Sequence, residues 1–420
     1  MASGYMNMKI PWFQVLMVAL LAVVNASPAT ATTYFITKTG SDSNSCTAAR
    51  SQGTPKLTIT NGLSCLIAGD TLQVGTGTYA EEFNYSGPSG TSWSAPITIQ
   101  AIPGSTPVIQ PASGAQRVFT FTGSVQYVVV DGFVLDGINV ATDVIKIDVA
   151  TAGHIRVKNS ELKNAKANGF YSPTGSSGNE LLNLNVHDNA TFNFNPYGHG
   201  IYIGGPNNLV DGCTIHDQRT GVSPSGGSDG IQLYNSGGGA DNNILRNNRI
   251  YNNSSFGIQA THGTGTLIYN NVVYGNGAGG NVPGGIETDF SETSVGIYNN
   301  TIYANTNCGV CIGAGTSNAV VENNIVYLNT GTNITNSGSG TTQTTNLAGT
   351  NPLFVNPSAF DFHLQLGSPA IGAGTNLSSI FTTDKDGVLR LSTGAWNIGA
   401  YQFVPSGAIM APPQNLRIVQ

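Results

Sequence analysis

Charged side chains are scarce in this chain. Lys, Arg, Asp and Glu make up only 9% of its 420 residues, which is low for a helical protein, whose exposed faces need such residues. The net charge is -6 and no basic run occurs, so nucleic acid is not an expected partner. The 54 glycines, together with many Asn, Thr, Ser, Val and Ile residues, favour short strands and tight turns instead.

Long apolar runs are missing after the N-terminus, and residues 1–31 have the pattern of a secretory signal. Lys9 supplies a positive charge, Trp12 to Val24 is apolar, and Ala29-Thr30-Ala31 is a small-x-small cleavage site. The alternative is an anchor helix, but the apolar run is short for a membrane span. We therefore expect an exported protein, secreted or at the cell surface. Its mature chain would begin near Thr32 and contain no transmembrane segment.

Cysteine is also rare, with five residues. Because an exported chain can form disulfides, we expect Cys46 and Cys65 to be bonded, which would stabilise the fold by ~3 kcal/mol on a chain-entropy estimate. Cys308 and Cys311 form a C-x-x-C, which would suit metal or redox chemistry. No second C-x-x-C or cluster of histidines completes a zinc site, so we interpret Cys308 as a small buried hydrophobic residue.

One phrase repeats between Asn243 and Asn329: a polar pair, a spacer, a β-branched residue and a tyrosine. Its four copies are residues 246–251, 269–274, 298–303 and 322–327. Self-similarity at a period of about 20–50 residues indicates a solenoid. The repeated phrase therefore predicts the architecture, although it does not identify a substrate.

From Val125 onward the repeats align into columns. An inward β-branched column is formed by Leu135, Leu162, Val186, Ile215, Ile250, Val273, Ile302 and Val326. Three places earlier lies a turn column of Gly132, Asn159, Asn183, Gly212, Asn247, Asn270, Asn299 and Asn323, whose amides could bond one another in a ladder. A second inward column is formed by Ile145, Phe170, Ile201, Ile231, Ile258, Ile286 and Val310.

Units of about 24–34 residues fit one turn of three short strands. Crossovers between parallel strands are right-handed, so we predict an all-β fold, a right-handed parallel β-helix, over residues 32–403. A loose helical spacing over Pro55 to Ile67 predicts a helical N-terminal cap. The expected parts are the N-terminal cap and first coils (32–124), the regular repeats (125–329), an irregular C-terminal cap (330–403) and a Pro/Gly linker tail (404–420).

Three segments resemble the exported bacterial right-handed parallel β-helix proteins, the pectate-lyase-like superfold. Tyr34-Phe35-Ile36-Thr37, followed by Ala68-Gly69-Asp70-Thr71-Leu72, is similar to the N-terminal block of that group. The Asn-Asn-x-Ile/Val-Tyr repeats resemble its β-helix repeats, and the segment from Pro352 to Tyr401 resembles its C-terminal end. The resemblance implies a polysaccharide partner, because the group contains polysaccharide lyases, glycoside hydrolases and alginate epimerases. It also contains adhesins, so the fold alone does not give the function.

Candidate catalytic residues cluster around two long loops, Asp188 to Gly198 and Asp217 to Ser228. These loops follow two outward histidines, and long loops on a rigid scaffold are where function tends to be placed. A histidine could act as base or acid, an Asp could orient it, an Arg could neutralise a substrate carboxylate, and a Tyr could return a proton. The candidates are His187, His199, His216, Asp229, Arg219 and Tyr202. The alternative is that these groups only bond loop backbone.

Further outward residues could bind substrate or a metal. Amides and phenols suit a sugar, and the candidates of this kind are Tyr171, Gln232, Tyr234, Gln259 and Tyr251. Glu287 and Asp289 share one strand face and could form a hydrolytic dyad, a Ca²⁺ site or a plain solvated face. Apart from that Ca²⁺, no cofactor is expected.

Two functions fit these observations. The first is a carbohydrate-active enzyme, a lyase, hydrolase or epimerase acting on an acidic polysaccharide. The second is a non-catalytic surface or matrix protein that binds polysaccharide through its outer tyrosines. Convergence of His187, His199, His216 and Asp229 in one cleft would favour the enzyme. In either case we expect a monomer.

Overall fold

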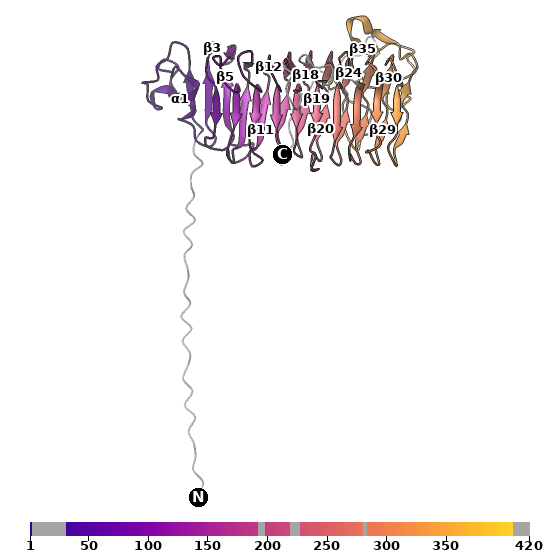
Figure 1. Cartoon of the computed structure of the whole chain (residues 1–420), viewed down its shortest axis with the longest axis horizontal. Helices are drawn as coiled ribbons and strands as arrows, with labels where there is room; N and C mark the ends of the chain where they lie inside the picture. The colour runs from indigo at the N-terminus through magenta and orange to yellow at the C-terminus, as the bar shows by residue number, and fades with distance from the viewer. Residues whose placement is uncertain (2–30, 192–197, 219–226, 280–283, 406–420) are drawn as a thin grey trace. The chain divides into compact units, whose positions relative to one another are not determined.

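Three parallel sheets wind through residues 33–348, and consecutive strands pass from one sheet to the next (Figure 1). The computed structural model describes residue 1 and residues 31–191, 198–218, 227–279 and 284–405. Within these residues the sheets, which we name A, B and C, contain 12, 11 and 10 strands. The strand order in each sheet follows the sequence, with every third strand adjacent in the regular coils. The predicted right-handed parallel β-helix is therefore confirmed.

The bounds of the strands show how short each segment of the coil is. Sheet A contains β1 (Thr33–Ile36), β2 (Thr71–Val74), β5 (Ile97–Ala101), β8 (Gln126–Asp131), β11 (Gly153–Lys158), β14 (Glu180–Leu182), β17 (Leu209–Asp211), β20 (Ile244–Arg246), β23 (Leu267–Tyr269), β26 (Gly296–Tyr298), β29 (Val320–Glu322) and β32 (Thr342–Thr344). Sheet B contains β3 (Gly77–Tyr79), β6 (Pro107–Ile109), β9 (Val134–Asp136), β12 (Glu161–Lys163), β15 (Asn185–His187), β18 (Thr214–His216), β21 (Arg249–Tyr251), β24 (Val272–Tyr274), β27 (Thr301–Tyr303), β30 (Ile325–Tyr327) and β33 (Leu347–Ala348).

Sheet C contains β4 (Phe83–Tyr85), β7 (Phe119–Phe121), β10 (Ile145–Ile147), β13 (Phe170–Ser172), β16 (Ile201–Ile203), β19 (Ile231–Leu233), β22 (Ile258–Thr261), β25 (Gly284–Asp289), β28 (Cys308–Ile312) and β31 (Ile334–Asn336). An antiparallel pair, β34 (Phe354–Asn356) and β35 (Asp361–Leu364), follows the coils. The described helices are η1 (Ala48–Arg50), α1 (Ile59–Leu63) and η2 (Pro357–Ala359).

The core consists of the inward columns that the repeats predict. Every member of both columns, from Leu135 to Val326 and from Ile145 to Val310, has an exposed fraction of 0%. Strand alternation explains this: in sheet B the inward residue is the middle one of three, as in β15, and in sheet C two inward residues flank an outward one, as in β16. Burying Ile, Leu, Val and Phe in this way removes apolar surface from water in every coil.

The corners between the sheets are buried, and amide ladders satisfy their backbone groups. At the A–B corner, Asn248, Asn271 and Asn300 each donate from Nδ2 to Oδ1 of the asparagine one coil further on, at 3.0 Å. This buried ladder lies one residue after the predicted turn column, within which Asn183 donates to Asn159 and Asn323 donates to Asn299. The first residue of each asparagine pair, such as Asn247 (φ 57°), has a left-handed backbone, and the second residue points its amide inward.

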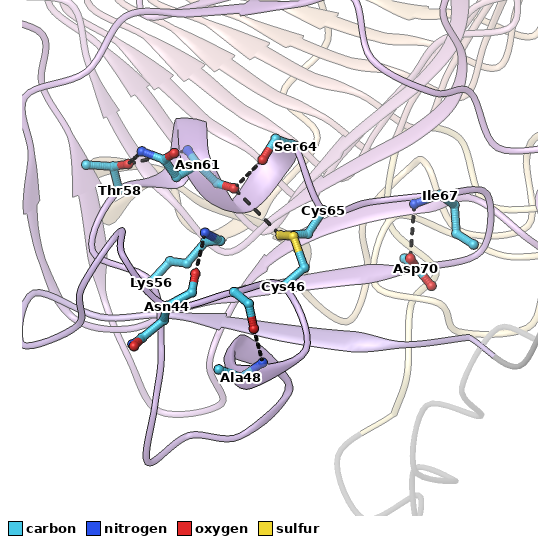
Figure 2. The surroundings of a disulfide bond; sticks show 11 residues. Asn44, Cys46, Ala48, Lys56, Thr58, Asn61, Ser64, Cys65, Ile67 and Asp70 are labelled. Carbon is cyan, nitrogen blue, oxygen red and sulfur yellow. Dashed lines mark hydrogen bonds between the residues drawn. A yellow bond between two sulfur atoms is a disulfide. The ribbon is translucent and has the colours of Figure 1, made fainter.

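A short helix and a disulfide cover the first coil (Figure 2). Gly62 of α1 sits directly on the side chains of Ile36 and Leu72, where a Cβ would lie within 2.7 Å of both. The two oxygens of the Glu81 carboxylate accept hydrogen bonds from the first two N–H groups of this helix, at 3.0 Å each. Figure 2 shows that the Cys46–Cys65 disulfide ties the loop after β1 to the residues that follow α1.

A second disulfide joins Cys308 and Cys311, which differs from the interpretation of Cys308 as a lone hydrophobic residue. Both side chains are buried and pack against Phe256. Cys213 is free and buried; its Sγ accepts from the backbone N–H of Leu184, so the thiol occupies a place that asparagines fill in later coils.

The segment after the last coil lies along the side of sheets A and B. β31, β32 and β33 first add another coil beyond Asn329. Phe354 and Phe362 then pack on Tyr274 and Tyr303 of sheet B, in the region where Figure 1 shows β35 beside β24 and β30. On the sheet A side, Tyr269 and Tyr298 belong to one buried cluster with Leu377, Phe381 and Trp396. The tyrosines of the repeated phrase therefore form the surface on which this segment docks.

The predicted signal peptide and linker tail lie almost wholly outside the described residues. In the part of the chain that the structure describes, none of the helices has the length and apolarity that a bilayer crossing requires.

Replacing Asn300 with Ala tests how much the asparagine ladder contributes to the stability of the fold. Asn300 accepts two hydrogen bonds from Asn271 and donates to the Ile268 carbonyl and to Asn324. Each buried group left unpaired costs about 1–3 kcal/mol, so we expect a loss of at least about 3 kcal/mol in the free energy of unfolding. The control is Asn84→Ala on the exposed face of β4, which should change stability by less than about 0.5 kcal/mol. Equal urea midpoints for the two variants would contradict this account.

Candidate functional site

One row of outward residues crosses seven neighbouring strands of sheet C. Each member follows an inward core residue, so strand alternation points it away from the core. The row consists of Lys146, Tyr171, Tyr202, Gln232, Gln259, Glu287 and Cys311, which pair in register from one strand to the next. We call it the sheet C row.

Aromatic rings occupy the middle of this face. The rings of Tyr171 and Tyr202 stack at 5.0 Å, and the ring of Tyr234 lies 6.5 Å from that of Tyr202. The strip continues through His262, 4.8 Å from Tyr234, to Phe290, 5.8 Å further on. Because the stacked rings cover one another's faces, they present edges, and phenol groups among them, to a ligand. This arrangement favours hydrogen bonding over face-on stacking with a sugar.

A chain of amides leads to Glu287 at the other end of the row. Gln232 donates to the side-chain oxygen of Gln259, and Gln259 donates to Oε2 of Glu287. Partial burial raises the pKa of Glu287 to about 7, and the nearby charges of Asp229 and Asp289 add to the rise, while the bond from Gln259 opposes it. A carboxyl group with this pKa can donate or accept a proton near neutral pH. Glu287 is therefore not a plain solvated side chain.

A second carboxylate, Asp289, lies two residues further along β25. Its Oδ1 accepts the backbone N–H groups of Phe290 and Gly315, both at 2.8 Å, and the carboxylate lies over Gly313, where any Cβ would come within 2.2 Å of it. These contacts fix its orientation. Two rises along a strand separate the backbones of Glu287 and Asp289 by ~6.6 Å.

Cations gather at the opposite end of the row. Lys146 lies 5.2 Å from the centroid of the Tyr171 ring and 3.1 Å from the carboxylate of Asp148. Arg117 lies 3.8 Å from both Asp143 and Asp148. The Lys146–Asp148 pair is partly exposed and therefore weak, so Lys146 can exchange partners with a substrate carboxylate. Asp143, which Arg117 also contacts, is buried.

Two predicted catalytic residues, His199 and Asp229, belong to a buried polar column at the edge of sheet C. They are 4% and 3% exposed. The backbone N–H of His199 donates to Asn168, that of Asp229 donates to Nδ1 of His199, and that of Phe256 donates to Asp229. Nδ1 of His199 thus faces both the backbone N–H and the carboxylate of Asp229, at 3.1 and 3.3 Å. The hydrogen bonds of His199 and Asp229 are those expected if these two residues bond backbone groups and do not act on a substrate.

The other two predicted histidines lie on sheet B. The rings of His187 and His216 stack at 5.0 Å, and the ring of His216 stacks on Tyr251 at 4.8 Å. His187 bonds Glu161 at 2.8 Å and Asp188 at 2.9 Å. The four residues expected to converge thus form two contacting pairs on different sheets, since His199 and Asp229 are 3.3 Å apart at the start of β16 and β19. Arg219 lies outside the described residues.

Several residues of this face were not singled out from the sequence. Arg117, His262 and Phe290 do not fall in the outward columns, and His262 (φ 60°) and Phe290 (φ 48°) have left-handed backbones that turn them onto the face. The sequence singles out Glu287 only together with Asp289, as a hydrolytic dyad, a Ca²⁺ site or a plain solvated face. Across the described ranges, no group of three or more His, Cys, Asp or Glu side chains is placed to hold a metal ion. The Ca²⁺ hypothesis for Glu287 and Asp289 stays a prediction.

The raised pKa of Glu287 predicts a pH-dependent cost to stability. A carboxyl group whose pKa is about 7 in the folded protein and about 4.5 when unfolded destabilises the fold as pH rises from 4.5 through 7. After discounting for partial exposure, Glu287→Gln should stabilise the protein by about 2 kcal/mol at pH 8 and by little at pH 5. Glu322→Gln in β29 is the control, and thermal unfolding at both pH values is the measurement. A stability gain that does not depend on pH would refute the burial argument.

Comparisons with known proteins agree with this architecture. A family model described as a right-handed β-helix region matches residues 195–348. Pectate lyase Pel9A is similar in structure, with a TM-score of 0.58 and 17% identity over 89% of this chain and 97% of that chain. A glycoside hydrolase aligns with a TM-score of 0.53 and 8% identity over 76% and 97% of the two chains. XylC, solved with xylose, aligns with a TM-score of 0.50 and 14% identity over 74% and 70%.

No curated protein sequence matches the chain significantly. The identities to the solved structures are low, so these structures establish the fold and leave the activity open. Coil topology, family model and structural neighbours agree that the chain folds as a right-handed parallel β-helix.

Proposed function

We propose that the protein is an exported enzyme that cleaves an acidic polysaccharide on the outer face of sheet C, with Glu287 as the proton donor. The observation that carries this proposal is the environment of Glu287. This carboxyl group has a pKa of about 7, is oriented by Gln259, and shares one strand face with a second carboxylate. The similarity to structures named as a pectate lyase and a glycoside hydrolase supports a polysaccharide substrate.

In the proposed reaction the protonated Glu287 donates to the glycosidic oxygen as the bond to the leaving sugar breaks. Asp289, held by two backbone N–H groups, takes a proton from the water that attacks the anomeric carbon. A separation of about 6.5–9.5 Å leaves room for this water and inverts the configuration. The backbone spacing of ~6.6 Å along β25 is compatible with such a pair.

The remainder of the row would hold the polymer. The phenol groups and amides of the sheet C face bond the hydroxyls of the sugar units. Lys146 and Arg117 lie where they can pair with the carboxylate of an acidic sugar unit. Asp229 acts through its charge on Glu287 and is a positioning residue. The stacked histidines on sheet B take no part in this mechanism.

Activity on a panel of acidic and neutral polysaccharides tests the proposal. We expect new reducing ends without ultraviolet-absorbing unsaturated products, and activity that survives a chelator. Glu287→Gln should lower kcat by about 10²–10⁴-fold, the usual contribution of a general acid, while Glu322→Gln should leave kcat unchanged.

Other outcomes separate the alternatives. Unsaturated products would establish lyase chemistry, and loss of activity with EDTA that Ca²⁺ restores would favour the Ca²⁺ hypothesis. Unchanged kcat in Glu287→Gln would refute the role of Glu287. Binding without any cleavage by the wild-type protein would favour the non-catalytic alternative.

A further inference from the structure

An open groove lies on a different part of the coil, where sheet A turns into sheet B. Its volume is about 570 Å³, and it runs across the coils that contain β9, β12 and β15. Polar side chains line it, among them Ser105, Asn159, Ser160, Glu161, Asn183 and Asn185. The groove contains none of the residues of the sheet C row.

The same turn column contacts main-chain groups elsewhere in the protein. In the later coils, the Nδ2 groups of Asn270, Asn299 and Asn323 donate to main-chain carbonyls of the C-terminal segment, at Thr383, Asn397 and Thr375, over 2.8–2.9 Å. The amide of Asn323 donates at the same time to Asn299, at 3.1 Å. These asparagines therefore donate, coil after coil, to main-chain acceptors that come from separate turns of the C-terminal segment.

In the groove, the corresponding amides keep a free donor. Asn183 donates to Asn159 at 2.9 Å, and Asn159 donates to Asp131 at 2.8 Å. Each amide nitrogen carries two hydrogens, and within the described residues the second one has no acceptor. Successive coils lie ~4.8 Å apart, so the two free donors are spaced for neighbouring acceptors of one ligand chain.

The residues at the borders of the groove indicate whether its ligand is a polypeptide or a glycan. The docked polypeptide is anchored by aromatic residues that pack on the tyrosines beside the turn, such as Tyr274 and Tyr298. Beside the groove the neighbours are ion pairs instead, with Arg156 bonded to Glu180 at 2.6 Å on sheet A and Lys163 bonded to Glu161 at 3.0 Å on sheet B. The apolar residues of the lining are Phe133, which is buried, and Val134, while hydroxyl groups can bond to each of the ion-paired neighbours.

The charged residues at the border of the groove indicate the charge of its ligand. Burial favours a raised pKa for Glu161, but hydrogen bonds from Lys163 and His187 hold the pKa of that carboxyl below its usual range, so it is ionised. Asp131 is the second carboxylate at the border. Lys158 pairs with Asp131 at 3.0 Å, and Lys163 pairs with Glu161 at 3.0 Å. Within the described residues, the border therefore offers no unpaired cation to an anionic polymer, while both carboxylates can accept hydrogen bonds from neutral hydroxyls.

We propose that this groove is a second binding site, one that takes an uncharged, hydroxyl-rich glycan chain laid across the coils. Asn159 and Asn183 donate to the oxygens of the glycan, and Glu161 accepts from its hydroxyls. The site holds a neutral chain while the Glu287 face acts on an acidic one. It does not depend on the proposed function, because the two surfaces share no residue.

The experiment measures binding of a soluble β-glucan, a xylan and a galactan to the full chain by affinity electrophoresis and calorimetry. All of the proteins compared in this binding experiment also carry Glu287→Gln, so that cleavage of a glycan on sheet C does not affect the measured binding. We expect the double variant Asn159→Gly/Asn183→Gly to raise the Kd for at least one neutral glycan by about tenfold or more. Both positions have positive φ (48° and 52°), which glycine adopts without strain.

Asn247→Gly is the matched control, because Asn247 has the same backbone (φ 57°) and the same donated bond to an aspartate, at 2.8 Å, outside the groove. It should change the Kd by less than about twofold. A second variant, Thr106→Leu, adds apolar bulk at the rim of the groove and should weaken the same glycan. Thermal unfolding confirms that each variant is folded.

Three results would overturn the proposal: no binding of any neutral glycan, equal binding by the wild-type and double-variant proteins, or a matching loss in the Asn247→Gly control. Polygalacturonate or alginate that competes for the groove would also refute the choice of an uncharged ligand. Cleavage activity that is lost in Glu287→Gln and kept in the double variant would show that the two sites are separate.

Discussion

The buried main-chain groups at the corners of each coil must find hydrogen-bond partners, and the rest of the structure depends on how they do so. Stacked side-chain amides supply those partners at all three corners. One ladder runs through Asn248 and Asn271, a second through Asn253 and Asn276, and a third through Asn179 and Asn208. Each amide accepts from a buried N–H group and donates to the next amide, and its second hydrogen goes to main chain or, in Asn179, to the hydroxyl of Ser176. The ladder thereby fixes the register between coils.

Because the register is fixed, the outer surface consists of straight rows of side chains. Three such rows lie on the surface. The first is the sheet C row, which contains Glu287. The second is the stack of His187, His216 and Tyr251 on sheet B, and the third is the turn column that continues into the groove. A polymer with a regular repeat can therefore meet similar groups at successive coils. This explains why one scaffold can carry separate surfaces for separate chains.

The sequence predicts the features that recur in every coil, and it does not predict the surroundings of a residue that occurs in one coil only. Both inward columns follow from periodicity, and every member of them is buried. The position of a residue around the coil is harder to infer, because a loop of unknown path separates His187 at the end of β15 from His199 before β16. The pKa of Glu287 depends on Asp229 and Gln259, which lie on neighbouring coils, and on burial. Periodicity carries no information about such coupling.

The docked C-terminal segment has a consequence for the order in which the chain folds. Contacts between adjacent coils join residues close in sequence, as with Asn271 and its partner 29 residues away, and can form one after another as the chain emerges. The contact between Arg390 and Asn270 spans 120 residues and needs several finished coils beneath it. Until the segment from Phe354 to Ala400 arrives, the tyrosines on which it packs are open to solvent. Docking of this segment therefore has to follow the formation of the coils that it covers.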